Sequence, residues 1–214
     1  MSIVFTFRNH RDGNDPNFEI VYVSVGMMDA ENFGSVVTGM ENVPANILVT
    51  SVNSESVDSS GYTLSQIMSA LDSADALLMR THGDPKYMRT FGRIMEKASQ
   101  NGTTTFIYCD EDDVMTEYRG TCDMDDEGFR IMRRYLGLTG DVNFRNAISW
   151  LCRRATGIDI PVDAPMIPRA QGIFHPDRPN PIDEEEYLSG IPDDPPSSGY
   201  CSANTIGYRT ITPT

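Results

Sequence analysis

Side chains that could do chemistry gather where apolar runs of the sequence end. In residues 76–88, ALLMRTHGDPKYM, an apolar run gives way to His82, Gly83 and Asp84. Asp84 followed by Pro85 is typical of a helix start, because aspartate accepts hydrogen bonds from the first helical N–H groups and proline needs none. Nothing in such a turn requires a histidine, and ligands of open α/β sheets bind beyond the carboxyl ends of parallel strands. Two interpretations stay open: a helix cap alone, or a site that contains His82.

A second cluster of acidic side chains follows another apolar run. The segment FIYCDEDDVMT, residues 106–116, ends a predicted strand in Asp110 and Asp112. This pattern resembles the motif of haloacid-dehalogenase phosphatases, in which one carboxylate attacks phosphorus, the other is acid or base, and Mg²⁺ bridges them. That family places the motif near the start of the chain and adds a lysine and an acidic motif downstream, whereas Gly140-Asp141 is followed by VNFRN. A solvent-exposed acidic loop is the favoured interpretation.

The other histidines and the cysteines show no spacing typical of a catalytic or metal site. His175 and Asp177 lie in QGIFHPD, a proline-rich stretch that either presents them to a partner or forms a plain surface loop. The four cysteines include no Cys-x-x-Cys pair, so free thiols are expected rather than disulfides or a zinc site. Because Walker A, Gly-x-Gly-x-x-Gly and Gly-x-Ser-x-Gly motifs are absent from the sequence, binding of ATP or NAD and serine hydrolase chemistry are not expected.

Charge and hydropathy argue against further classes of protein. The 31 acidic and 17 basic residues give a formal net charge of −14, which would repel the phosphates of nucleic acid. The sequence contains no run of about 18 apolar residues, so no membrane span is expected. The N-terminus, MSIVFTFRNHRDG, has no basic leader and no long apolar stretch, which favours a cytoplasmic protein over a secreted one.

The first two-thirds of the chain alternates strand-like and helix-like patterns. Runs rich in β-branched and aromatic residues predict strands at residues 3–7, 19–25, 46–52, 76–80 and 103–109. Apolar stripes of helical spacing predict helices around residues 64–71, 88–98, 129–136 and 144–151. This alternation predicts an α/β fold of parallel strands with crossover helices, followed by a helical pair.

Helix ends and domain limits can also be predicted from the sequence. Asn101-Gly102 would close the helix that Asp84 begins, Gly137 would end the first helix of the pair, and Asp141 would cap the second. Prolines crowd the chain after Ile160, which predicts an extended segment. The predicted organisation is an α/β domain with its terminal helices at residues 1–158, a proline-rich segment at 159–192 and a flexible tail at 193–214.

Three short segments occur in the same order as in a known family. They are Arg80 to Gly83, then Tyr135, Leu136, Gly140, Asn143 and Asn146, and then Gly172 to Pro176. With them the chain resembles, over residues 18–190, the N-terminal part of the large subunit of cobaltochelatase and its relative, the H subunit of magnesium chelatase. The chain departs from the family at Asp84 and Thr139, where the family has glycine, and at Phe174, where it has tyrosine. Family members are several times longer.

The resemblance implies a flavodoxin-like core and a role in tetrapyrrole metal insertion for cobalamin biosynthesis. In that family the large subunit binds the macrocycle, AAA+ partner subunits hydrolyse ATP, and divalent cobalt or magnesium is the substrate. No cofactor bound by this chain itself is implied, and no chelatase activity of the chain alone. His82 and His175 are the candidates for contacting the macrocycle or its metal, since imidazole suits cobalt. Arg80, Arg89 and Arg169 are the candidates for binding macrocycle carboxylates.

Two alternatives from other classes remain. One is a stand-alone protein-interaction module without catalysis. The other is the Mg²⁺-dependent phosphatase that would use Asp110 and Asp112.

Overall fold

Five strands form the central sheet of the protein. The structure, a computed structural model, describes residues 3–9, 15–166, 173–174, 200–202 and 208–209. The strands are β1 (Val4–Arg8), β2 (Asn17–Ser24), β3 (Asn46–Asn53), β4 (Ala76–Thr81) and β5 (Thr104–Cys109). They lie side by side in the order β1-β3-β2-β4-β5. The sheet belongs to a compact unit that spans Met1–Met166.

The last four strands of the sheet are parallel and give it a flavodoxin-like order. β2 pairs with β3 on one side and with β4 on the other, and β4 pairs with β5. The chain therefore leaves β2 toward one edge of the sheet and later returns to build toward the other edge, as in flavodoxin-like folds. β2 and β4 are buried on both faces, which explains their continuous apolar sequences IVYV and ALLM. The predicted α/β, flavodoxin-like fold is confirmed.

The first strand differs from the prediction of a wholly parallel sheet. β1 pairs antiparallel with β3, with Val4 opposite Val52 and Arg8 opposite Leu48. The polar segment between β1 and β2 is too short to hold a crossover helix, and a parallel connection needs a dozen residues or more. The chain therefore reverses direction after β1, and β1 lies at the outer edge of the sheet.

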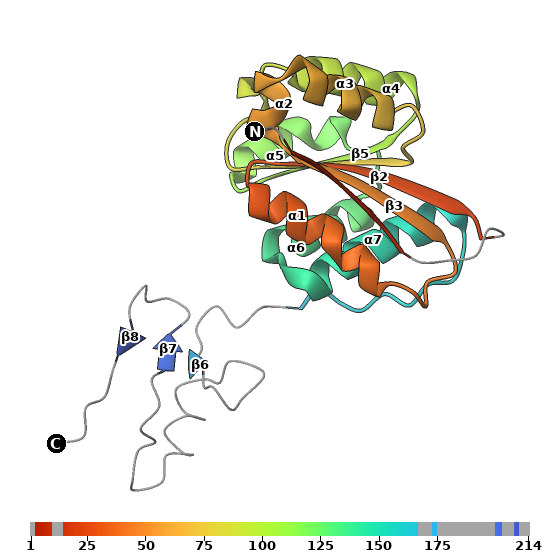
Figure 1. Cartoon of the computed structure of the whole chain (residues 1–214), viewed down its shortest axis with the longest axis vertical. Coiled ribbons are helices and arrows are strands. Elements are labelled where there is room, and N and C mark those ends of the chain that lie inside the picture. Colours follow the sequence, from red (N-terminus) through yellow and green to blue (C-terminus); the bar gives the residue numbers. More distant parts are fainter. Residues whose placement is uncertain (1–2, 10–14, 167–172, 175–199, 203–207, 210–214) are drawn as a thin grey trace, which may run out of the picture. The chain divides into compact units, whose positions relative to one another are not determined.

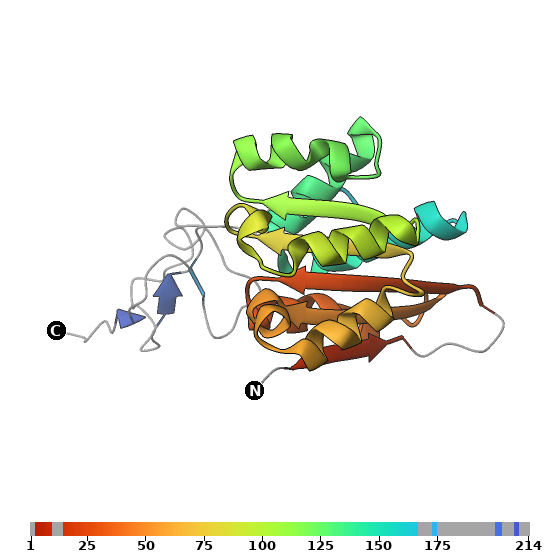
Figure 2. The same cartoon turned by 90° about the horizontal axis from the view of Figure 1, so that it is seen from above.

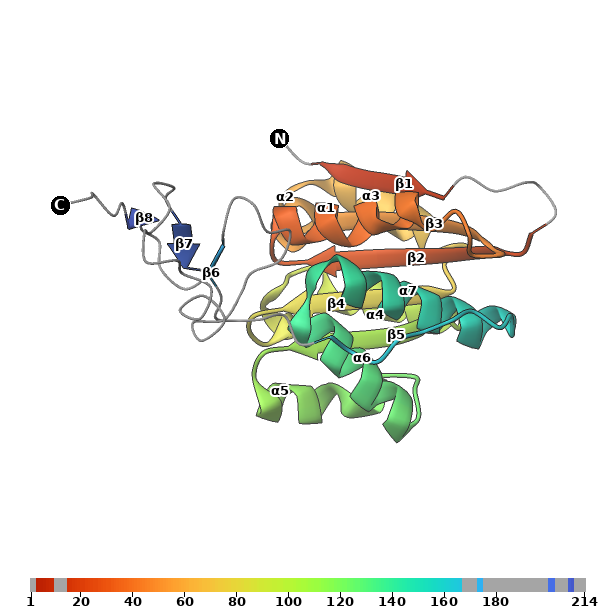
Figure 3. The same cartoon turned by 90° about the horizontal axis from the view of Figure 1, so that it is seen from below.

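Helices cover both faces of the sheet (Figure 1). One face carries α1 (Met27–Ser35), α6 (Asp126–Leu138) and α7 (Gly140–Thr156), which Figure 3 shows in front of the strands. The other face carries α2 (Ser54–Ser59), α3 (Gly61–Ala70) and α4 (Phe91–Gln100), as Figure 2 shows. The short α5 (Asp112–Glu117) packs beside β5. The described residues also contain three 3₁₀ helices, η1 (Val36–Gly39), η2 (Pro85–Tyr87) and η3 (Tyr118–Thr121). The predicted helical pair corresponds to α6 and α7.

Some predicted helix ends are confirmed and others are wrong. Asn101 ends α4, and Gly102 has the positive φ of 67° that favours glycine. Asp84, however, caps the 3₁₀ turn η2 by accepting from the backbone N–H of Lys86, and α4 begins only at Phe91. Gly137 lies inside α6 and does not end it, and glycine suits this position because an added Cβ would meet the Tyr108 hydroxyl oxygen at 2.9 Å. 

The start of α7 also differs from the prediction. Thr139 takes the N-cap position with a φ of 56°, and Asp141 lies in the first helical turn instead.

The segment after α7 is held by the residues that carry the sequence resemblance. The Tyr135 hydroxyl donates to the carbonyl of Asp163 at 2.5 Å, and the Asn146 side chain accepts from the backbone N–H of Asp163 at 3.0 Å. The Asn143 side chain makes two hydrogen bonds with the backbone of Met166, at 2.8 and 2.9 Å. Tyr135, Asn143 and Asn146 therefore fix an extended strap, residues 158–166, against α6 and α7, and Ile160 of this strap is buried.

A second unit spans Ile167–Thr214. Its described part is a small antiparallel sheet of β6 (Ile173–Phe174), β7 (Tyr200–Ser202) and β8 (Tyr208–Arg209), in the order β6-β7-β8. The domain limits at 158 and 192 stay predictions. No helix within the described residues has the length and apolar character needed to cross a membrane.

Candidate functional site

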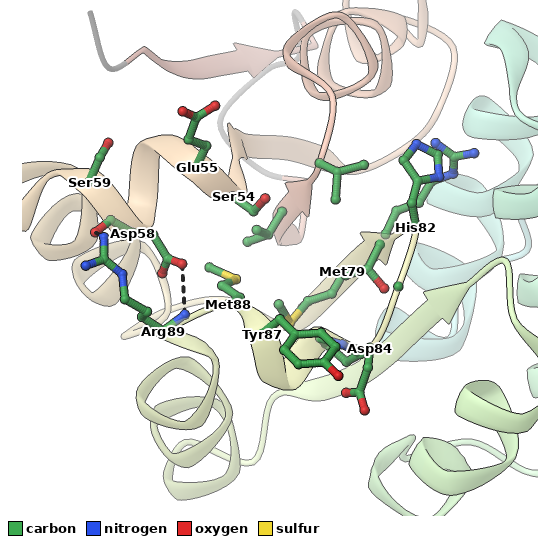
Figure 4. A pocket seen from close by; sticks show the side chains of 16 residues that line it. Ser54, Glu55, Asp58, Ser59, Met79, His82, Asp84, Tyr87, Met88 and Arg89 are labelled. Carbon is green, nitrogen blue, oxygen red and sulfur yellow. Dashed lines mark hydrogen bonds between the residues drawn. The ribbon is translucent and has the colours of Figure 1, made fainter.

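A pocket of about 500 Å³ opens at the carboxyl ends of the central strands. Its apolar wall is formed by Val23 and Val25 at the end of β2 and by Met79 of β4. The loop from Thr81 to Arg89 and one side of α2 complete it, and Figure 4 shows how these side chains surround the opening. This is the point where the chain order reverses between β2 and β4, which is the general ligand position of open α/β sheets.

His82 and Asp110 meet because their strands are paired in register. Thr81 is the partner of Cys109 across β4 and β5, so the residues that follow each strand emerge side by side. The Nδ1 atom of His82 lies 2.5 Å from the Oδ2 atom of Asp110. The two side chains are 64% and 44% exposed, so the imidazole can be reached from solvent. Asp84 is a cap, as one interpretation of this motif expected, whereas a site that contains His82 stays a prediction, with His82 paired at the rim of a pocket.

The Asp110 carboxylate is stabilised in its charged form. Burial opposes its ionisation, but hydrogen bonds from His82 and Tyr108 and the charge of Arg80 outweigh burial and lower the pKa of Asp110. Tyr108 shows the opposite shift, because burial and the nearby Asp110 carboxylate raise the pKa of its hydroxyl group. Asp110 is therefore an anion that accepts from two neighbours.

Arg80 of β4 lies behind the pocket, and its guanidinium already contacts other residues of the protein. Its Nε atom donates to the Leu136 carbonyl at 3.2 Å, and its Nη1 atom lies 3.5 Å from a carboxylate oxygen of Asp29. The guanidinium also lies 5.6 Å from the centre of the Tyr108 ring. Because the side chain is only 14% exposed, Arg80 holds α1 and α6 to the strand ends.

Asp29 extends this polar chain to β2. Its Oδ2 atom accepts from the Tyr22 hydroxyl and from the Ser24 hydroxyl, each at 2.5 Å. Together with Arg80, Asp29 therefore connects the ends of β2 and β4 beneath the loop that follows β2.

Asp58 of α2 fixes the opposite wall of the pocket. Its carboxylate accepts from the backbone N–H groups of Arg89 and Thr90, at 2.8 and 2.9 Å, and from the Thr90 hydroxyl at 2.6 Å. Burial opposes its ionisation, but these hydrogen bonds and the Arg89 charge lower the pKa of Asp58. The guanidinium of Arg89 donates to the Asp58 backbone carbonyl at 2.7 Å, which places it on the pocket wall.

The floor of the loop after β4 is anchored by Asp84. Its carboxylate accepts from the Tyr118 hydroxyl at 2.8 Å and pairs with the Lys86 ammonium. Burial and this contact with Asp84 raise the pKa of Tyr118 to about 12. Tyr87, in contrast, is 79% exposed and offers its ring to the pocket mouth.

The structure brings three of the five predicted tetrapyrrole-binding residues together. His82, Arg80 and Arg89 all line the pocket. His175 and Arg169 fall outside the described residues. Cys109, Cys122 and Cys152 are buried free thiols, as predicted for these three.

The two carboxylates of the Asp-x-Asp motif turn to different partners. Asp110 pairs with His82, whereas Asp112 pairs with Arg133 of α6. In the part of the chain that the structure describes, no group of three His, Cys, Asp or Glu side chains could hold a metal ion.

Three important residues were missed by sequence reasoning. Asp29, Asp58 and Tyr108 each serve the site through a partner on another element. Only Tyr108 could have been recognised from the sequence, because it carries a hydroxyl group in an apolar strand and stands two positions before Asp110. Asp29 and Asp58 lie in segments without a strong apolar stripe. Asp29 contacts Arg80 near the end of β4, and Asp58 contacts Arg89 in the loop after β4, so both partners are distant in sequence.

Comparison with known proteins supports the fold. No family model matches the chain, and no curated protein matches it in sequence. Among solved structures, the chain is similar to the catalytic subunit of cobaltochelatase from Mycobacterium tuberculosis, with a TM-score of 0.55 and 14% sequence identity. The match covers 75% of this chain but 12% of that chain. This chain therefore shares its fold with a small region of a chelatase subunit.

Proposed function

We propose that this chain forms part of the tetrapyrrole-binding surface of a cobaltochelatase-type large subunit. The observation that carries the proposal is the pocket at the reversal point between β2 and β4, which gathers His82, Arg89 and Tyr87 around an apolar wall. The shared fold with a region of a cobaltochelatase catalytic subunit supports the same role. The chain would act in the cytoplasm, in cobalamin biosynthesis, with AAA+ subunits that hydrolyse ATP.

The chemistry of the pocket suits one edge of a flat ring that carries carboxylates. A volume of about 500 Å³ falls within the range of small-molecule sites. Val23, Val25 and Met79 provide apolar contact, and the exposed ring of Tyr87 provides an aromatic face for stacking. Arg89 uses one guanidinium N–H group on Asp58, so other donors stay available for a macrocycle carboxylate.

The metal ion enters this proposal as a substrate. The role assigned to this chain is to hold and orient the macrocycle, while the remaining body of a chelatase and the AAA+ partners would complete the insertion reaction. Binding energy at such a site serves catalysis by positioning the ring.

A titration of the full chain tests the proposal. Hydrogenobyrinic acid a,c-diamide and a water-soluble porphyrin are each titrated while the absorbance of the macrocycle is followed. We expect saturable binding, weakened about tenfold by Arg89→Ala, since a hydrogen bond to a charged group contributes about 1.5–3 kcal/mol. Arg130→Ala is the matched control, because Arg130 lies on α6 and pairs only with the exposed Glu127 among the residues described.

Two outcomes would count against the proposal. Absence of binding to both macrocycles would reject it and leave the interaction-module hypothesis. Equal weakening by Arg89→Ala and Arg130→Ala would show that binding depends on overall charge and not on this pocket.

A further inference from the structure

The pocket contains one side chain whose role macrocycle binding alone does not explain. An apolar wall, Tyr87 and Arg89 suffice to hold a carboxylated ring. The histidine at the rim is held in a 2.5 Å contact with the carboxylate of Asp110, the residue after β5, and this contact fixes the direction of its ring. We propose that the Nε2 atom of His82 is an axial ligand to a metal already inserted in the tetrapyrrole, so that the site prefers the metallated ring over the metal-free ring. This inference rests on the proposed function.

The contact with Asp110 decides which ring nitrogen of His82 is free. An ionised carboxylate has no proton to donate, so it can only accept. The Nδ1 atom must therefore carry the proton, and in neutral imidazole the lone pair then lies on Nε2. Metal-binding histidines characteristically donate their other ring N–H to a carboxylate, which fixes the orientation of the ring and raises its basicity.

Asp110 is itself held in place, so the direction of the imidazole is set by the fold. Tyr108 of β5 donates to Asp110, and the Tyr108 ring lies beneath the Arg80 guanidinium. Arg80 is in turn tied to Asp29 and to the Leu136 carbonyl. Asp110 is therefore a positioning residue, supported from β4, β5, α1 and α6.

The Nε2 atom is also available to a ligand. The His82 side chain is 64% exposed and lines the pocket, and its only hydrogen bond among the described residues is made by Nδ1. Figure 4 shows His82 at the end of the pocket, away from the Asp58–Arg89 wall. A ring whose carboxylate is bound by Arg89 would extend along the pocket toward the end that His82 lines.

The coordination step needs no further reactant. In the neutral tautomer with the proton on Nδ1, the Nε2 lone pair would form one bond to a divalent transition metal in the ring, and no proton would be released. Imidazole is a good ligand for cobalt, whereas a metal-free ring offers no acceptor for this bond. The consequence is a site that retains the product of metal insertion until it is passed on.

The test compares a cobalt(II) porphyrin, under nitrogen, with the same porphyrin without metal. With the full-length wild-type chain we expect binding of the cobalt form to be at least about tenfold tighter, which corresponds to about 1.4 kcal/mol. The electron paramagnetic resonance spectrum should show splitting from one axial nitrogen. His82→Phe keeps an aromatic ring but removes Nε2, so both porphyrins should bind it with equal affinity and the nitrogen splitting should vanish.

A second variant tests the positioning role of Asp110. Asp110→Asn can donate to Nδ1 and release the other tautomer, so affinity for the cobalt form should fall about tenfold while affinity for the metal-free form stays unchanged. The ¹⁵N chemical shifts of His82 should report a gain of the Nε2–H tautomer in this variant.

The outcomes separate this inference from the proposed function. If neither porphyrin binds, the proposed function fails and this inference falls with it. If both bind the wild type equally, or if the nitrogen splitting persists in His82→Phe, the proposed function stands and the axial role of His82 is overturned.

Discussion

At the scale of single residues, the site is organised by carboxylates that accept hydrogen bonds from neighbouring elements. Asp29 connects the ends of β2 and β4, Asp110 orients His82, and Asp58 fixes the turn that carries Arg89. Each of these carboxylates has two or more donors in place of water, and for Asp58 and Asp110 these contacts outweigh burial and lower the pKa. The shape of the pocket therefore depends on side chains that do not all face the ligand.

Removal of the Asp58 carboxylate should loosen the pocket wall. Asp58→Ala leaves the N–H groups of Arg89 and Thr90 and the Thr90 hydroxyl without their acceptor. We expect a loss of about 1–2 kcal/mol in the free energy of unfolding, measured by urea titration. Asp72→Ala is the control: it removes an exposed pair with Lys97 and should change stability by less than about 0.5 kcal/mol.

The same variant has a defined pH dependence. The pKa of Asp58 is lowered from 3.8 in the folded state, so its stabilising contribution is present above pH 3.8 and is lost as the pH falls through the folded pKa. The stability difference between wild type and Asp58→Ala should shrink only below about pH 3.8. A difference that shrinks between pH 5 and 7 would point to another group.

At the scale of elements, close approach between helices and strands positions the site. Gly34 of α1 faces Phe7 of β1 and Ser51 of β3, and a Cβ atom there would lie 2.4 Å from the Phe7 ring. α1 is the helix that carries Asp29 and begins directly after β2. The distance of α1 from the sheet therefore affects the polar chain behind the pocket.

Gly34→Ala should destabilise the protein although alanine is the better helix former. Overpacking against Phe7 and Ser51 should cost about 1–3 kcal/mol, which exceeds the gain of about 1 kcal/mol in helix propensity. Gly92→Ala in α4, where nothing lies within 4 Å, should instead be neutral or stabilising. Thermal unfolding of both variants gives the comparison, and a smaller side chain in Phe7→Leu should restore part of the loss in Gly34→Ala.

Elements that are buried on both sides were predictable, and those that depend on distant partners were not. β4 and β5 were predicted to within one residue because fully buried parallel strands are continuous apolar runs. The antiparallel direction of β1 depends on its pairing with β3, and the late start of α4 depends on Asp58, 31 residues before Arg89. His82 could be singled out from the sequence because the turn after β4 does not require a histidine. Its contact with Asp110 could not be predicted, because it depends on the register of β4 with β5.

At the scale of the whole molecule, the compact unit Met1–Met166 extends past its last helix. The strap of residues 158–166 buries Ile160 and is fixed by Tyr135, Asn143 and Asn146. The sequence placed a domain limit at 158 because the prolines begin there. The hydrogen bonds make the strap a structural partner of α6 and α7, and the limit at 158 stays a prediction.

Two truncated chains test where this unit ends. A chain of residues 1–166 should unfold cooperatively, with the same free energy of unfolding as this region has in the full chain. In a chain of residues 1–158 the free energy of unfolding should be about 2–4 kcal/mol lower, because Ile160 and its contacts are removed. Trp150 of α7, which packs against Gly128 of α6, can report the unfolding transition. Equal stability of the two truncated chains would support the predicted limit at 158.

The position of β1 has a consequence for the order in which the chain is made. β1 is synthesised before β3, which is its only partner strand in the five-stranded sheet of the described residues, with Val4 opposite Val52. At translation rates of about 5–20 residues per second, Phe5 and Phe7 wait roughly 2–9 s before their partner exists. During that interval the nascent segment has an apolar face and unpaired backbone groups, which is where we expect a cotranslational chaperone to bind. β1 is thus a strand that nascent-chain folding must protect before the sheet can include it.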